Sequence, residues 1–201
     1  HIFSSSQDAR GFKIGAGVFC VLKSGKKLLN PEPHMSIPIV SIVGKSNSGK
    51  TTLIEKLITE LTGRGWRVAT IKHNRHGFEI DHEGKDSYRH KKAGAKMTIV
   101  SSPHSLALVA DAERDYSFAE IRDRFIADVD IIITEGFKVN DYPKIEVFRS
   151  ELKRELISRK DDGLIAVASD VPMDMDVPCL DLNNVGPIAD FIEARFLKAS
   201  D

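Results

Sequence analysis

Residues 37–52 read IPIVSIVGKSNSGKTT, an apolar run followed by a short loop rich in glycine and serine. A near-continuous apolar run of this length predicts a strand that is buried on both faces of a parallel sheet. After Val43 the chain reads Gly, four residues and then Gly-Lys-Thr, and the apolar periodicity of residues 51–62 predicts a helix. A strand, a glycine-rich loop and a helix in this order predict a phosphate-binding loop, or P-loop, in an α/β fold.

This loop carries the groups that hold a nucleoside triphosphate. Its glycines allow backbone N–H groups to point at phosphate oxygens, and the following helix adds the positive end of its dipole. Lys50 is placed to reach the β- and γ-phosphates, and the Thr51 hydroxyl is placed to bind Mg²⁺. We predict that a purine nucleoside triphosphate binds with Mg²⁺ at Gly44, Ser46, Asn47, Ser48, Gly49, Lys50, Thr51 and Thr52.

The remainder of the chain alternates short β-branched runs with amphipathic segments. This alternation predicts a three-layer P-loop NTPase fold with a mostly parallel central sheet. The hairpin-like pair at 97–101 and 106–110 predicts that the sheet is partly mixed. Further strands are expected at 67–72, 130–134, 144–148 and 164–168, and further helices at 85–93, 117–126 and 185–197.

The first 34 residues read differently from the rest. Met35 directly precedes the first strand, so we expect residues 1–34 to be an N-terminal appendage, either a non-native extension or a hairpin. Residues 35–201 are then expected to form one P-loop nucleotide-binding domain, which is the size of a single well-cored domain.

A second component of the site is an acid at a strand end. Residues 129–136 read VDIIITEG, an apolar strand that ends in Glu135. In P-loop proteins a carboxylate at such a strand end faces the loop and holds Mg²⁺ or its water. We therefore predict that Glu135 is a metal ligand, with a simple cap or salt bridge as the alternative.

A basic segment follows the second predicted strand. Ligands of open α/β sheets bind beyond the carboxyl ends of the strands, so Lys72, His73 and Arg75 are expected beside the nucleotide, where they would bind an anion. Two alternatives are a metal site at His73, His76 and His82, and a solvated polar loop without a ligand.

Charge and composition exclude several classes of partner. Lys plus Arg and Asp plus Glu are equal at 29 each, so no global field would draw the chain to nucleic acid or an anionic membrane. No apolar run approaches a membrane span, and the two cysteines are too few for a disulfide framework. We expect a cytoplasmic protein without a nucleic-acid or membrane partner.

Several motifs in a fixed order resemble those of the molybdopterin-guanine dinucleotide biosynthesis adaptor protein B (MobB) family. The resemblance covers roughly residues 36–201. The motifs are GKTTL at 49–53, TIKH at 70–73, GKDS at 84–87 with AGA at 93–95, and TEGFK at 134–138 with PKIEV at 143–147. The P-loop alone is shared by very many proteins, whereas the later blocks in this order are more specific.

The resemblance implies a GTP-binding, weakly hydrolysing accessory protein. It would assist a guanylyltransferase that attaches GMP to molybdopterin, and it would form a homodimer. By position, the resemblance assigns phosphate and Mg²⁺ to residues 49–52, the metal to Glu135, and an adjoining pocket to Lys72, His73 and Asp86. The phosphate of molybdopterin is a candidate ligand for this basic loop.

The preference for guanine comes from the family alone, because the guanine-reading motif Asn-Lys-x-Asp is absent from the chain. The nearest equivalent by position is Asp170, which follows the predicted strand at 164–168. Its carboxylate would accept hydrogen bonds from a guanine edge, or it would cap the next segment before Pro172.

Three other functions remain open at this point. A small-molecule kinase would need an acidic or otherwise base-like group near its acceptor and usually an arginine-bearing lid, whereas the loop after the second strand consists mostly of Lys, His and Arg. A GTP-dependent metal-insertion chaperone would use the histidines of that loop. A scaffold would present nucleotide or pterin without turnover. No water-positioning residue is identified, so any hydrolysis is expected to be slow and the catalytic residues are unknown.

Overall fold

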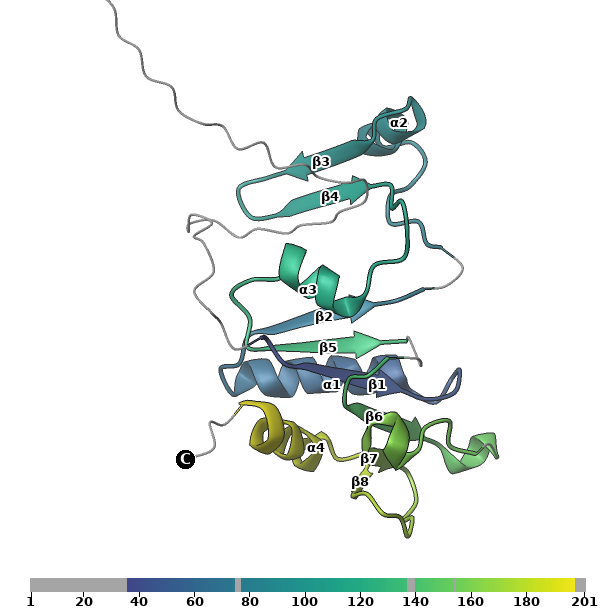
Figure 1. The fold of residues 1–201 in the computed structure, drawn as a ribbon. Coiled ribbons are helices and arrows are strands. Elements are labelled where there is room, and N and C mark those ends of the chain that lie inside the picture. The colour runs from purple at the N-terminus through teal and green to yellow at the C-terminus, as the bar shows by residue number, and fades with distance from the viewer. Residues whose placement is uncertain (1–35, 75–76, 137–139, 154, 198–201) are drawn as a thin grey trace, which may run out of the picture. The chain divides into compact units, whose positions relative to one another are not determined.

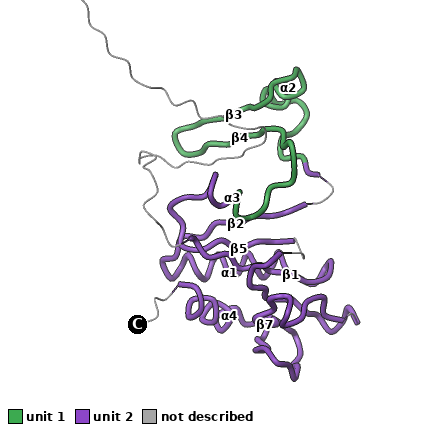
Figure 2. The backbone as a smooth tube through the Cα atoms, in the orientation of Figure 1, with its two compact units in different colours: residues 1–28, 79–121 green, residues 29–78, 122–201 purple. Residues whose placement is uncertain are grey.

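The computed structural model describes residues 36–74, 77–136, 140–153 and 155–197. The predicted appendage at 1–34 lies outside these described residues, and so do Arg75 and His76 of the basic segment. The described chain divides into two compact units, residues 79–121 and residues 36–78 with 122–197 (Figure 2). The alternation of strands and helices in the sequence does not reveal this division.

The larger unit is built on a six-stranded sheet in which every neighbouring pair of strands is parallel (Figure 1). Two strands, β1 and β5, are nearly continuous apolar runs, and they lie buried in the centre of the sheet. The order is β2 (Val68–Lys72), β5 (Ile131–Glu135), β1 (Ile39–Val43), β6 (Lys144–Phe148), β7 (Leu164–Ser169) and β8 (Cys179–Asp181). Because all six run the same way, their carboxyl ends meet at one edge.

One face of this sheet packs against α1 (Lys50–Gly63) and α4 (Val185–Ile192). Alternate strand residues such as Ile42 and Val147 join helix residues such as Leu57 and Ile188 in a single apolar cluster. Leu57 and Ile188 have no exposed surface. Burial of this cluster is the main stabilising contribution to the larger unit.

The opposite face carries buried ionisable side chains, which is unusual in a sheet centre. The Lys144 ammonium donates hydrogen bonds to the carbonyl oxygens of Asn140 and Asp162. The Glu146 carboxylate accepts backbone N–H groups from Ile157 and Ser158, with N–O distances of 2.7 and 2.8 Å. Burial raises the pKa of Glu146. Both side chains thus fasten the connections on either side of β6.

The smaller unit contains α2 (Asp86–Lys92) and an antiparallel hairpin of β3 (Met97–Ser101) and β4 (Leu106–Ala110). The hairpin forms a two-stranded sheet of its own. The predicted antiparallel pairing is therefore confirmed, but it lies outside the central sheet, in which all described strand pairs are parallel. The helix α3 (Phe118–Phe125) begins in this unit and ends in the larger one.

Most predicted elements are present, with boundaries that shift by one or two residues. The structure adds β8, a three-residue strand, and short 3₁₀ turns at Ser150–Leu152 and Lys160–Asp162. The helix predicted over 185–197 ends as an α-helix at Ile192 and continues as a π-helical turn, Glu193–Leu197. Among the helices that the structure describes, none is long and apolar enough to cross a membrane.

Candidate functional site

The loop between β1 and α1 has the backbone geometry of a phosphate cradle. Gly44 and Gly49 have φ angles of 143° and 92°, which favour glycine, and α1 begins directly after Gly49. A Cβ at Gly44 would lie 2.6 Å from the carbonyl oxygen of Val147, so only glycine fits against the end of β6. Asn47 also has a positive φ angle, 65°. The predicted loop is thus formed mainly by its backbone.

The side chains of the loop differ in exposure and in hydrogen bonding. Ser46, Asn47, Thr51 and Thr52 are exposed. The Ser48 hydroxyl is buried and has no hydrogen-bond partner among the described residues. The Lys50 ammonium donates a hydrogen bond of 2.8 Å to the carbonyl oxygen of Lys45, so its side chain folds back over the loop.

The predicted metal ligands are in contact. The Thr51 hydroxyl lies 2.8 Å from one oxygen of Glu135, although the two residues are 84 positions apart in sequence. The Lys72 ammonium lies 3.4 Å from the other oxygen. Mg²⁺ in nucleotide sites takes one or two protein oxygen ligands together with phosphates and water. The hydroxyl and carboxylate at this position fit Mg²⁺ in the way that the sequence predicts.

The structure places part of the basic segment at the same edge of the sheet. Lys72 ends β2 beside Glu135, and the backbone N–H of His73 donates to the Glu135 carbonyl at 3.0 Å. A Cβ at Gly136 would lie 2.7 Å from the carbonyl oxygen of His73, so this turn requires glycine as well. Lys72 and His73 are therefore next to the predicted metal ligand.

Two other predicted pocket residues are not among the described residues of the larger unit. Arg75 lies outside the described residues. Asp86 belongs to the smaller unit, where its exposed carboxylate pairs with Arg89 at 3.5 Å. Groups of three or more His, Cys, Asp or Glu side chains that could hold a metal ion are absent from the described part of the chain.

Asp170 is engaged by a neighbouring turn. Its two carboxylate oxygens accept the backbone N–H of Ser150 at 2.8 Å and the Ser150 hydroxyl at 3.1 Å. These hydrogen bonds, together with the nearby Arg149, hold the pKa of Asp170 below its usual range. The cap that Asp170 forms thus serves the 3₁₀ turn after β6, and the turn at Pro172 is not its partner.

Sequence reasoning missed one cation at this edge. Arg149 follows β6, and its guanidinium lies 3.4 Å from the position that a Cβ of Gly49 would occupy. The signal was available, because side chains at the carboxyl ends of parallel strands gather at one edge, and Arg149 comes directly after a predicted strand.

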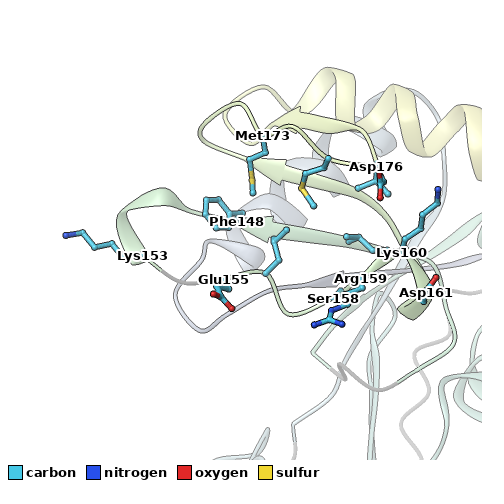
Figure 3. A pocket seen from close by; sticks show the side chains of 13 residues that line it. Phe148, Lys153, Glu155, Ser158, Arg159, Lys160, Asp161, Met173 and Asp176 are labelled. Carbon is cyan, nitrogen blue, oxygen red and sulfur yellow. The ribbon is translucent and has the colours of Figure 1, made fainter.

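A cavity of about 930 Å³ lies between the connection after β6 and the connection after β7 (Figure 3). Its apolar lining includes Phe148, Leu156 and Met173. In Figure 3 the charged groups of Lys153 and Glu155 point away from Phe148 and Met173. None of the predicted site residues that the structure describes lines this cavity.

Comparison with known families identifies the chain. The family described as Molybdopterin guanine dinucleotide synthesis protein B, MobB, matches residues 39–170, which include the P-loop, Glu135 and Asp170. The chain belongs to the MobB family. The matched region also contains Arg149, all of the smaller unit and the larger unit up to residue 170.

The chain is similar to individual MobB proteins over most of their length. The chain is 40% identical over 158 residues to the molybdopterin-guanine dinucleotide biosynthesis adapter protein of Haemophilus influenzae, covering 78% of this chain and 88% of that protein. It is 42% identical over 163 residues to the protein of the same name from Escherichia coli, covering 78% and 91%. The crystal structure of Bacillus subtilis MobB shares 30% identity and a TM-score of 0.60, covering 81% and 99%. The α/β fold with a parallel central sheet is confirmed by this similarity.

Proposed function

We propose that the chain binds GTP with Mg²⁺ and acts as an accessory protein of molybdenum cofactor biosynthesis. In this role it assists the guanylyltransferase that attaches GMP to molybdopterin. The observation that carries the nucleotide part is the 2.8 Å contact between the Thr51 hydroxyl and Glu135 beside a loop that admits only glycine at Gly44. Family membership supports the biosynthetic part.

The shape and charge of the loop favour a polyphosphate as the ligand rather than a single small anion. The cradle is continuous with the N-terminus of α1, and Lys45 and Lys50 add positive charge to it. Mg²⁺ bound at Thr51 and Glu135 would neutralise charge on the phosphate chain. Lys72, at 3.4 Å from Glu135, would then release this carboxylate and turn to an anion such as the phosphate of molybdopterin.

The adapter role is supported by the names of the relatives. The proteins of Haemophilus influenzae and Escherichia coli are both named molybdopterin-guanine dinucleotide biosynthesis adapter proteins. An adapter needs a partner, and the guanylyltransferase is the partner that this chemistry requires. We expect hydrolysis by the isolated chain to be slow, because no described side chain is identified as positioning water.

A homodimer is part of the same proposal. The hairpin of the smaller unit exposes Ile99 and Val100, at 53% and 52% of their surface, and a two-stranded sheet is marginally stable by itself. These two side chains are consecutive in β3 and project from opposite faces of the hairpin, so pairing with a second copy would cover one of the two faces. Sedimentation of the purified chain should give the mass of a dimer, and substitution of both residues by threonine should shift it toward the monomer.

Calorimetric titration tests the nucleotide. The purified chain is titrated with GTP, with ATP and with GDP, each with Mg²⁺, and GTP should bind more tightly than ATP. Glu135→Gln should weaken the dependence of GTP affinity on Mg²⁺, whereas the exposed Glu55→Gln on α1 serves as a matched control. If ATP binds as tightly as GTP, the guanine assignment is wrong, and a kinase or a scaffold becomes the better explanation of the same loop.

A further inference from the structure

Arg149 is a cationic side chain beside the P-loop of the larger unit to which no role has yet been given. Its Nε and Nη2 atoms both lie 3.4 Å from the position that a Cβ of Gly49 would take, so the guanidinium rests against the loop directly before Lys50. The side chain is half-buried. A long cationic side chain is therefore packed at the N-terminus of α1.

This placement gathers positive charge at the loop, and the nearby Asp170 carboxylate offsets only part of it. The N-terminus of a helix carries partial positive charge, which repels a cation and attracts an anion. Lys45 and Lys50 add two further cations to the same loop. Among the residues that the structure describes, the Arg149 guanidinium makes no hydrogen bond or salt bridge. A polyanion between these groups would neutralise the remaining positive charge of Arg149, Lys45 and Lys50.

The backbone on both sides of Arg149 is fixed. On the strand side, the Val147 carbonyl oxygen would lie 2.6 Å from a Cβ at Gly44, so β6 and the loop are in close contact. On the other side, Asp170 holds both the backbone N–H and the hydroxyl of Ser150. The Leu152 N–H closes the turn onto the Arg149 carbonyl at 3.2 Å. The arginine is thus presented on a rigid support.

We propose that Arg149 binds the phosphate chain of the nucleotide in the P-loop of its own chain, and that Asp170 positions it through Ser150. This inference rests on the proposed nucleotide binding and adds two residue roles to it. A planar guanidinium donates two parallel hydrogen bonds to a phosphate, which a lysine does not reproduce. Asp170 acts through the turn and needs no contact with guanine.

The test uses two ligands that share phosphates and differ in the base. Wild type, Arg149→Ala and Arg149→Lys are titrated calorimetrically with GTP and with inorganic triphosphate, each with Mg²⁺. Arg149→Ala should lose about tenfold or more in affinity for both ligands, and Arg149→Lys should lose less. Arg195→Ala removes an exposed arginine beyond α4 and should bind both ligands as wild type does. Thermal unfolding of each variant checks that the fold is retained.

Asp170→Asn separates positioning from guanine recognition. If Asp170 positions Arg149, the variant should weaken binding of inorganic triphosphate as well as GTP. It should also have no further effect when Arg149 is already alanine. A loss confined to GTP, or an equal loss in the presence and absence of Arg149, would overturn the positioning role.

The outcomes also separate this inference from the proposed function. If wild type binds GTP tightly and Arg149→Ala binds it equally well, the role of Arg149 is wrong while nucleotide binding stands. If wild type binds neither GTP nor inorganic triphosphate, both proposals fail.

Discussion

The two faces of the six-stranded sheet come from the same strands and are both buried, yet they hold different chemistry. The face toward α1 and α4 is apolar throughout its cluster. The opposite face carries Ser41, Thr134, Lys144 and Glu146, each no more than 1% exposed. There the Thr134 hydroxyl donates to Ser41 at 2.9 Å, and Asn140 donates to the same serine at 3.3 Å.

The difference shows that one face of the sheet mainly stabilises the fold, whereas the other face orders the connections at the carboxyl ends of the strands. Apolar packing needs matching volume, and it does not select a particular loop conformation. Buried polar groups need hydrogen-bond partners, and those of Lys144 and Glu146 are backbone groups of the connections that flank β6. One of these connections begins at Arg149. The polar face therefore orders the segments around the candidate site.

The largest expected effect is on the apolar face. Leu57→Ala removes a fully buried side chain between α1 and the sheet, and it should lower the free energy of unfolding by about 2–5 kcal/mol. Urea unfolding measures this loss. Nucleotide affinity of the folded protein should remain unchanged, because Leu57 lies within α1 in the apolar cluster and is not a residue of the loop. A loss below about 1 kcal/mol would contradict the view that this cluster is the main source of stability.

A substitution on the polar face should destabilise the connection after β6, which Glu146 holds by hydrogen bonds. Glu146→Ala removes the acceptor for the backbone N–H groups of Ile157 and Ser158, and each buried donor left without a partner costs about 1–3 kcal/mol. Urea unfolding measures the total, and hydrogen exchange should become faster at these two amides. Glu151→Ala, at an exposed glutamate of the following turn, is the matched control. Unchanged exchange at both amides would show that the connection is held by other contacts.

A change within the loop should affect binding and leave both faces intact. Lys50→Ala should weaken GTP binding roughly tenfold or more, since a charge-assisted interaction contributes about 1.5–3 kcal/mol. Its free energy of unfolding should fall by no more than about 0.5–1.5 kcal/mol, the contribution of the hydrogen bond from Lys50 to Lys45. Calorimetry measures the first and urea unfolding the second. Lys56→Ala, at an exposed lysine of α1, should leave the affinity unchanged.

The smallest effect concerns pH. Because burial raises the pKa of Glu146 above its ordinary value of 4.5, the folded state binds the proton more tightly than the unfolded state. This contribution to stability is fully present below pH 4.5 and is lost as the pH rises through the raised pKa. Glu146→Gln lacks this titration. Between pH 4 and 8, urea unfolding should therefore show wild type losing stability relative to Glu146→Gln as the pH increases.

The sequence predicted the features that depend on neighbours along the chain. The strand β1, the loop with its glycines and the start of α1 are encoded within residues 37–62, so local periodicity was sufficient. Glu135 was predicted as a metal ligand because it is the acid that directly ends one apolar strand, which is visible in the local sequence. The three-residue β8 was missed, because a strand of that length has no measurable alternation.

The sequence by itself thus determined the strand, the glycine-rich loop and the helix of an α/β fold, and it predicted phosphate at the loop and a metal at Glu135. Only the tertiary structure decided that Glu135 contacts Thr51, that Arg149 rests against Gly49, and that Asp170 holds Ser150. It also separated the hairpin from the central sheet. The physical reason is that these contacts join strand ends that are distant in sequence. Parallel pairing and register bring such ends to one edge, and no local pattern records which strands are neighbours.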